Sequence, residues 1–431
     1  MPRGRSWIFF AGSSKTAEVR LGADPKKGKP LTERPRTDGI VCFAGVDWWY
    51  HNRGHSECQL MRRLAARCPV LWINSIGMRA PAPGRTELPL RRYARKLTST
   101  LKGLRRDPCG MWVYSPLFIP RYTPTVLRWN GRLLFEQVRL LQRWIGIQRP
   151  AVWATVPTVA SAVERGHWTR RVFNRSDVFS EFPEVDAELI RGLEERMLSW
   201  ADDVVYVNAG LFARERGRVK SAHLLSHGVD YAHFARGRGG PSPGPEPPEL
   251  RGLPRPIVGF YGALDDYTVD LDLMIRTARR VRPGTLLVIG PKAMEIQSLL
   301  AEPNVVYLGP IPYEELPRYA TRFDIGIMPW LRNRWIEGCN PIKLKEYLAI
   351  GFPIVSIAFP ELEPYADLVH VAAGPEGFLE QLGRALEEDS PAQVAQRRAR
   401  VAEDSWDALA DRVAGMLGID EGRPSPAVGR G

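Results

Sequence analysis

The sequence predicts an α/β protein built from two Rossmann-like, doubly wound parallel-sheet domains. Short apolar runs of strand length alternate with segments of helical period in both halves of the chain. A segment rich in Pro and Gly separates the two halves. The length of 431 residues, with 44% hydrophobic residues, exceeds one ordinary core and suffices for two.

The first half contains six apolar runs that we expect to be buried strands: 40–44, 70–73, 111–114, 151–154, 171–174 and 204–207. Segments of helical period lie between several of them, at 58–67, 126–145 and 188–200. Strands that alternate with helices in this way are typical of a parallel sheet whose connections run through helices.

The second half shows the same alternation more clearly. Its expected strands are 257–261, 286–289, 305–308, 325–328 and 354–357, and its expected helices are 270–282, 292–300, 314–321 and 341–350. Residues 376–418 also have helical period. We therefore divide the chain into a disordered basic arm (1–36), an N-terminal Rossmann-like domain (37–235), a linker (236–255), a C-terminal Rossmann-like domain (256–400), a C-terminal helix (401–418) and a disordered tail (419–431).

The charge distribution argues against a nucleic-acid-binding protein. The formal net charge is +12, but the excess of Lys and Arg lies in residues 1–36 and 85–106. The rest of the chain is close to neutral, whereas a nucleic-acid-binding body spreads basic residues over a structured face. We expect no nucleic-acid partner.

The cysteines and the hydropathy pattern predict a cytoplasmic protein. The five cysteines show no paired spacing, which is typical of reduced thiols. No apolar stretch approaches the roughly 20 residues that span a bilayer. The apolar run at 7–12 is too short for a signal-peptide core.

The segment 329–353 carries the clearest chemical signal. Asn340 is a suitable N-cap and Pro341 a suitable first residue for a helix that Gly351 ends. The start of such a helix presents free N–H groups and a partial positive charge, which suit a phosphate. Lys343 in the first turn would then face the anion, and Glu346 one turn later can accept hydrogen bonds from sugar hydroxyls. The alternative is a plain helix cap with Glu346 on the solvated surface.

Several ordered blocks resemble one known family. The run NPIKLKEYLAIGFPIVS resembles the donor-site signature of retaining glycosyltransferases with the GT-B fold, of the family 4 type. The blocks SWADDVVYVNAGL, HLLSHGVDYAHF, IVGFYGALDDYTVDLDLM and NVVYLGPIPYEELPRYATRFDIGIMPW resemble other parts of these enzymes, in the same order. Together with FNRSDVFSEFPEVD, they resemble bacterial enzymes that build teichuronic acid and other surface polysaccharides. The resemblance covers roughly residues 40–400.

The resemblance implies a retaining transfer of a sugar from a UDP- or GDP-linked donor to a glycan or lipid-linked acceptor, without a cofactor or a metal. The donor would bind the C-terminal domain, and the acceptor the N-terminal domain. The implied donor-binding residues are Gly262, Pro329, Gly338, Asn340, Pro341, Lys343 and Glu346. The implied catalytic residues are Lys343, Glu337 and Asp177, and the implied acceptor-binding residues are Gly45, Asp47 and Trp48.

Some of these residues also have plainer interpretations. Trp48 can belong to a tight strand–helix turn with a buried indole, and Asp177 can cap a helix or a turn. His51 and His55 are four residues apart, but Gly54 lies between them and argues against a metal-binding helix. We expect no metal site.

The sequence departs from the family pattern at two places. The family often has two glutamates separated by seven residues; Glu346 matches the second, but Gly338 occupies the first position and Glu337 comes one residue early. Residues 263–267 (ALDDY) lack the Arg and Lys that often hold the pyrophosphate. Lys343, the helix start and Arg332 or Arg334 would have to neutralise it. A sugar-nucleotide epimerase and a catalytically degenerate scaffold of a polysaccharide assembly complex therefore remain as alternatives.

Residues 88–106 predict a basic amphipathic helix with apolar residues at 90, 93, 97, 101 and 104. Such a helix favours contact with an anionic membrane surface. A lipid-linked acceptor would place this contact on the inner face of the plasma membrane. The alternative is a surface helix that packs its apolar stripe on the core.

Overall fold

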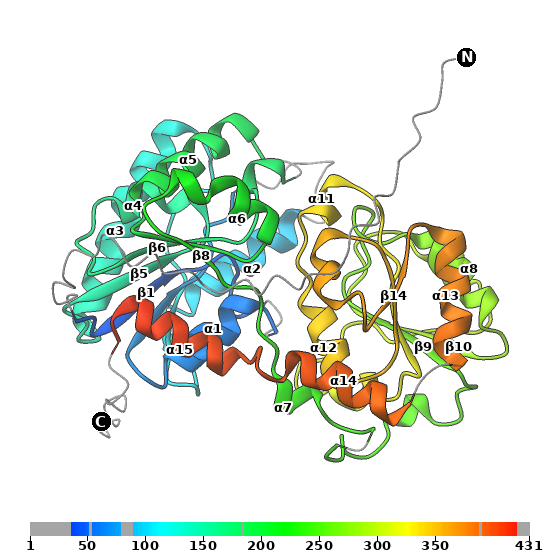
Figure 1. The fold of residues 1–431 in the computed structure, drawn as a ribbon. Coiled ribbons are helices and arrows are strands. Elements are labelled where there is room, and N and C mark those ends of the chain that lie inside the picture. Colours follow the sequence, from blue (N-terminus) through cyan, green and yellow to red (C-terminus); the bar gives the residue numbers. More distant parts are fainter. Residues whose placement is uncertain are drawn as a thin grey trace, which may run out of the picture. The chain divides into compact units, whose positions relative to one another are not determined.

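The computed structural model describes residues 36–50, 54–78, 89–182, 185–238, 240–387 and 390–419, without the side chains of 89–93 and 95. The predicted arm lies outside the described residues except for Arg36, and so does the predicted tail from residue 420 onwards. The described residues form two parallel-sheet α/β domains (Figure 1), so the predicted fold class is confirmed. The limits that we assigned to the domains stay predictions.

The N-terminal sheet has eight strands in the order β3-β4-β2-β1-β5-β6-β7-β8. All neighbouring strands are parallel except β3 and β4, which are antiparallel at one edge. The strands are β1 (Gly39–Phe43), β2 (Val70–Ile73), β3 (Leu104–Arg106), β4 (Trp112–Tyr114), β5 (Pro150–Ala154), β6 (Arg171–Arg175), β7 (Asp203–Tyr206) and β8 (Ala222–Leu224).

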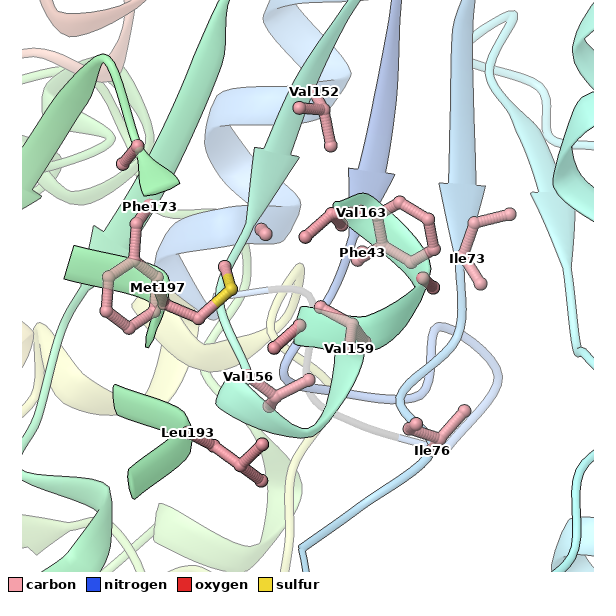
Figure 2. Close-up of a cluster of buried hydrophobic side chains, with 14 of the residues drawn as sticks. Phe43, Ile73, Ile76, Val152, Val156, Val159, Val163, Phe173, Leu193 and Met197 are labelled. Atoms are coloured by element: carbon pink, nitrogen blue, oxygen red, sulfur yellow. The ribbon is translucent and has the colours of Figure 1, made fainter. Parts of the chain in front are cut away.

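Helices bury both faces of this sheet, which explains why its central strands are almost continuously apolar. One face packs on α3 (Pro124–Trp144), α4 (Ala160–Val163) and α5 (Ala187–Trp200). Figure 2 shows part of this core, where Phe43, Val152 and Phe173 from three strands meet side chains of the covering helices. The opposite face packs on α1 (Ser56–Leu64) and α15 (Trp406–Leu417). The remaining helices of this half are α2 (Pro89–Leu101), α6 (Ala209–Glu215) and α7 (Tyr231–Phe234).

The C-terminal sheet has six parallel strands in the order β11-β10-β9-β12-β13-β14, which is the Rossmann order. They are β9 (Ile257–Tyr261), β10 (Thr285–Ile289), β11 (Val305–Tyr307), β12 (Ile325–Met328), β13 (Ile354–Ile357) and β14 (His370–Ala372). The helices are α8 (Leu271–Arg280), α9 (Gln297–Leu300), α10 (Leu316–Ala320), α11 (Arg334–Glu337), α12 (Ile342–Ile350), α13 (Pro375–Glu387) and α14 (Pro391–Ala402). In both sheets the order reverses beside the first central strand, and such a reversal opens a binding crevice at the carboxyl ends of the strands.

The helical segment near the C-terminus is divided between the two domains. A break after Ala402 separates α14, which packs on α12, from α15, which packs on α1 and the N-terminal sheet (Figure 1). Thr37 reinforces this packing: its N–H donates to the carbonyl of Gly418 and its hydroxyl to the carbonyl of Leu417. The last helix of the described residues, α15, therefore completes the core of the first domain.

Two sequence expectations about elements were wrong. The predicted helix 292–300 is reduced to α9, whose N-terminal bound is Gln297. The predicted basic helix 88–106 ends at Leu101, and Leu104–Arg106 instead forms the edge strand β3. Its apolar stripe therefore does not continue to residue 104, although Leu97 and Leu101 are exposed. No helix in the described part of the chain is long and apolar enough to cross a membrane.

Candidate active site

A cavity of about 570 Å³ is lined by residues that follow the strands of both sheets. Asp177 and Val207 follow strands of the N-terminal sheet, and Gly262 and Trp330 follow strands of the C-terminal sheet. The start of α12 completes the wall with Pro341, Lys343 and Glu346, among others. The geometry follows from the parallel topology, because the carboxyl ends of parallel strands lie at the same edge.

Lys343 is a half-buried cation in the first turn of α12. Among the described residues, no hydrogen bond or ion pair reaches its Nζ atom, which lies 4.5 Å from the ring centroid of Phe260 and 5.8 Å from that of Trp330. Burial lowers the pKa of this ammonium to about 8. A charge that loses part of its hydration without an ion pair is unfavourable, and aromatic faces compensate only part of this loss. The arrangement therefore favours an anion in the cavity.

Glu346 lies one turn further along α12 and is buried. The hydroxyl of Tyr261 donates to its Oε2 atom at 2.8 Å. Burial raises the pKa of this carboxyl to about 7. One carboxylate oxygen is thus used by the protein, and the other can accept hydrogen bonds from a ligand. The interpretation of Glu346 as a solvated surface residue was wrong.

The loop after β9 passes very close to Lys343. Gly262 has φ +147°, and a Cβ atom there would lie 2.3 Å from the Nζ atom of Lys343. A side chain at this position would displace the ammonium group from its place over Phe260. The positive φ angle favours glycine here, and its lack of a side chain leaves the ammonium in place over Phe260.

Asn340 does not cap α12, contrary to our expectation. The N-cap position is Pro341, and no side chain caps the helix. The amide nitrogen of Asn340 instead donates to the carbonyl of Val207 at 2.6 Å and to the hydroxyl of Ser226 at 3.1 Å. Both acceptors follow strands of the N-terminal sheet. Asn340 thus joins the two walls of the cavity and leaves the first N–H groups of α12 uncapped by side chains, as a phosphate site requires.

Glu57 is a cavity residue that the sequence reasoning missed. It lies at the start of α1, where its Oε2 atom accepts the N–H of Gly45 at 2.9 Å and its Oε1 atom accepts the hydroxyl of Thr155. Burial raises the pKa of this carboxyl to about 7. The available signal was a glutamate in the first turn of the helix that follows β1, but only the folded structure shows that it faces the cavity.

Asp177 follows β6 and lines the cavity, as expected. Burial raises the pKa of its carboxyl. The guanidinium of Arg175 donates to the carbonyl of Asp177 at 2.7 Å and also binds the buried carboxylates of Glu194 and Glu215. A buried ion-pair network therefore holds the backbone of the loop that carries Asp177.

His227 is a further cavity residue that no expectation included. Its Nδ1 atom lies 2.7 Å from the hydroxyl of Ser56. Burial, with the nearby charge of Lys345, lowers the pKa of this imidazole to about 3, so the ring is neutral at physiological pH. Lys345 also donates to the carbonyl of His227 at 2.6 Å and pairs with Asp404 at 2.8 Å. In contrast to Lys343, Lys345 is fully engaged in the structure.

The three predicted acceptor residues do not line the cavity. Trp48 is only 2% exposed, and its Nε1 atom donates to Asp107 at 2.9 Å. An indole in this position cannot stack on a sugar, so the interpretation of a buried Trp holds. Asp47 accepts the hydroxyl of Ser99 at 2.9 Å, and Gly45 lies behind Glu57.

The loop 329–338 contributes fewer cavity residues than expected. Glu337 and Gly338 are exposed, and Glu337 lies in a separate depression beside α11. Arg332 lies in the same depression and donates to the carbonyl of Ala373 at 3.0 Å. Neither Arg332 nor Arg334 lines the main cavity. Among the described residues that line it, Lys343 is the only lysine or arginine.

Pro329 is also absent from the lining, and its carbonyl accepts the N–H of Asp270 at 2.9 Å. Among the described residues, no group of three or more His, Cys, Asp or Glu side chains could hold a metal ion.

Comparisons with known proteins indicate the class of enzyme. Residues 255–388 match the family model of glycosyl transferases group 1. The chain is 26% identical over 406 residues to a protein of Bacillus subtilis (strain 168) named "Putative teichuronic acid biosynthesis glycosyltransferase TuaH", with 88% of this chain and 97% of the relative covered.

Solved structures show the same fold. Sucrose-phosphate synthase from Thermosynechococcus elongatus has a TM-score of 0.62 at 16% identity, with 88% of this chain and 98% of that chain covered. HepE from Anabaena, in complex with UDP and glucose, has a TM-score of 0.59 at 14% identity, with 89% and 99% covered.

The fold, the cavity and these matches define the class: the protein is a glycosyltransferase with a GT-B fold. Among named proteins, it is similar to TuaH of Bacillus subtilis. The predictions of a GT-B fold and of glycosyltransferase activity are confirmed.

Proposed function

We propose that the protein transfers a sugar, with retention of anomeric configuration, from a UDP- or GDP-linked donor to a glycan or lipid-linked acceptor of cell-surface polysaccharide synthesis. The name of the Bacillus subtilis relative supports the polysaccharide, and the HepE complex with UDP and glucose supports a nucleotide-linked donor. Retention rests on the resemblance of the α12 region to retaining enzymes. We place the reaction in the cytoplasm, without a cofactor or a metal.

The unpaired ammonium of Lys343 is the observation that carries this proposal. A nucleotide diphosphate at the uncapped start of α12 would supply the missing anion. Glu346 would accept hydrogen bonds from the ribose hydroxyls, and the base would lie near Gly262. All three residues line the same cavity.

This arrangement explains how the reaction is accelerated. As the bond between the sugar and the diphosphate breaks, negative charge grows on the leaving diphosphate. The N–H groups of α12 and the Lys343 ammonium are fixed before the reaction, so they stabilise this charge most strongly in the transition state. The acceptor hydroxyl would enter from the N-terminal wall, where Asp177 and Glu57 can accept hydrogen bonds from the acceptor sugar.

The test replaces Lys343 by alanine. We expect Lys343→Ala to lower donor turnover at least about 100-fold, the scale of removing one preorganised electrostatic contact, without lowering the melting temperature. Lys292→Ala is the matched control, because Lys292 is exposed in the same domain and does not line the cavity. Equal donor turnover in Lys343→Ala and the wild type would refute the role of Lys343.

One observation favours the degenerate-scaffold alternative. Where the family often has cations, Asp265 lines the cavity, and its carboxylate accepts the hydroxyl and the N–H of Thr268. A scaffold would not bind nucleotide sugars, so a thermal-shift screen without stabilisation by any of them would support it. An epimerase would convert the donor without an acceptor, which product analysis with donor alone detects.

A further inference from the structure

The long helix α3 has an apolar stripe on the side that faces away from the core. Leu127, Leu134 and Val138 pack inward. On another side, Trp129, Leu133, Leu140 and Trp144 are exposed. At 100° per residue these four positions lie within one narrow sector of the helix surface. The usual amphipathic pattern would place polar residues there.

A neighbouring segment adds two apolar side chains to this stripe. The side-chain amide of Gln137 binds the N–H and the carbonyl of Leu117, at 2.9 and 3.0 Å. Asn130 binds both backbone groups of Ile119 in the same way, each at 2.8 Å. These four hydrogen bonds hold the backbone against α3, while the side chains of Leu117 and Ile119 remain exposed.

We define the apolar ridge as six side chains that are between 43% and 69% exposed: Leu117, Ile119, Trp129, Leu133, Leu140 and Trp144. The backbone of the apolar ridge is held in place, because its residues belong to α3 or to the segment 117–119, which is hydrogen-bonded to α3. Trp144 is further held by an edge contact with Trp112, with ring centroids 5.3 Å apart.

A band of arginines borders the ridge. Arg128, Arg132, Arg139 and Arg143 follow one another along α3 on the sector next to the ridge, on the side away from Leu117. Glu136 is the acidic residue of α3, and it pairs with Arg139. The guanidinium of Arg132 lies 5.4 Å from the ring centroid of Trp129. A cation therefore lies directly beside the exposed indole of Trp129.

We propose that the apolar ridge and the arginine band dock the protein on an anionic lipid bilayer. Trp side chains combine an apolar ring with a polar N–H and suit the headgroup boundary. The leucines would reach the acyl region while the arginines bind lipid phosphates. A second copy of the chain fits less well, because an antiparallel symmetric contact between two ridges would bring arginine band beside arginine band.

This surface is different from the basic segment 88–106 that the sequence singled out, and it does not depend on the donor site. The proposed binding to a lipid bilayer is separate from the proposed reaction, and it can be tested without a nucleotide sugar.

The test measures flotation of the full-length protein with vesicles of phosphatidylcholine alone and with vesicles that contain 30% phosphatidylglycerol. We expect binding to the anionic vesicles, and weaker binding as salt rises, because salt screens the arginines. Absence of binding of the wild type to anionic vesicles would overturn the proposal.

Two double variants separate the two parts of the surface. Arg128→Gln with Arg132→Gln should weaken binding to anionic vesicles about 30-fold. Trp129→Ser with Leu140→Ser should weaken it at least about tenfold. The controls are Arg191→Gln with Arg251→Gln, and Leu386→Ser, which change exposed residues of the same types elsewhere. Unchanged binding in both ridge and band variants would assign the membrane contact to another surface and overturn the proposal.

Sedimentation of the wild type without lipid completes the test. Self-association that the Trp129 and Leu140 changes abolish would show that the ridge binds a second copy, and would also overturn the proposal. A protein that remains monomeric and binds anionic vesicles through these residues supports it.

Discussion

The side-chain amide of Asn208 connects the end of the N-terminal sheet to the loop before α12. Its Nδ2 atom donates to the carbonyl of Gly338 at 3.1 Å, while its Oδ1 atom accepts the N–H of Leu211 at 2.8 Å as the N-cap of α6. One residue thus both begins a helix and holds the donor loop, 130 residues away in the sequence.

Asn208→Asp should separate these two tasks. A carboxylate still accepts the N–H of Leu211, so the cap remains, but it cannot donate to Gly338. We expect the KM for the donor to rise several-fold with little change in melting temperature. Steady-state kinetics with varied donor measure this. An unchanged KM would mean that the hydrogen bond to Gly338 does not position the loop.

Lys343→Met should stabilise the protein without a ligand. Because burial lowers the pKa of Lys343 to about 8, the charged ammonium destabilises the folded state. This destabilisation is complete below pH 8 and is absent above pH 10.5, the ordinary pKa of a lysine. The unfolding free energy of the wild type should therefore rise between pH 8 and pH 10.5. Lys343→Met should raise the unfolding free energy by about 3 kcal/mol at pH 7, and this gain should vanish at pH 10.5. Urea unfolding at pH 7 and 10.5 measures it; an equal gain at both values would contradict the assignment.

Glu57→Gln should change the response of stability to pH at lower values. The pKa of Glu57 is raised from 4.5 to about 7, so between these values the folded state holds a proton that the unfolded state has released. This stabilising contribution is complete below pH 4.5 and is lost as pH rises through 7. Glutamine mimics the protonated carboxyl, so Glu57→Gln should exceed the wild type by up to about 3 kcal/mol at pH 8 and equal it at pH 4.5. A difference that does not vary with pH would exclude Glu57 as the titrating group.

Changes of Glu337 in α11 and of Glu346 in α12 should differ in their effect on activity. Glu346 lines the cavity, whereas Glu337 is exposed in a separate depression. We expect Glu346→Gln to lower kcat/KM at least about tenfold, since a hydrogen bond to a charged acceptor is lost. Glu337→Gln, the matched control, should stay within about twofold. Similar losses in both variants would restore a catalytic role for Glu337.

Trp48→Phe should act on stability rather than on acceptor binding. The change removes the hydrogen bond from Nε1 to Asp107 and leaves space in the core beside Trp72. We expect a loss of about 1–3 kcal/mol in unfolding free energy and an unchanged KM for the acceptor. A raised KM at normal stability would indicate that Trp48 contacts the acceptor after all.

The sequence predicted the architecture because long apolar strands leave a local signal. Strands β2, β9, β12 and β13 have the predicted bounds, and most of the others differ by one residue. The missed strands β3, β8 and β14 read LRR, AHL and HVA, and they lack the apolar run that revealed the equally short strands β4 and β11. The ladder contacts that define these strands come from neighbours elsewhere in the chain.

The site was only partly predictable for a related reason. Lys343 and Glu346 stand in a helix whose start was visible in the sequence. The surroundings of Lys343 were not visible, because Phe260 lies in β9 and Trp330 follows β12. Asn340 was misassigned as a cap because its true acceptor, the carbonyl of Val207, lies 133 residues away. Glu57 stands in the first turn of α1, but its position in the cavity arises only from the fold.

The packing of α15 on the first domain has a consequence for biosynthesis. When the ribosome has completed β8, the face of the sheet that α15 will cover is still bare, and about 180 further residues must be translated first. At roughly 5–20 residues per second this takes on the order of 10–40 s. During that interval the nascent N-terminal domain carries an apolar surface that attracts chaperones or other unfinished chains.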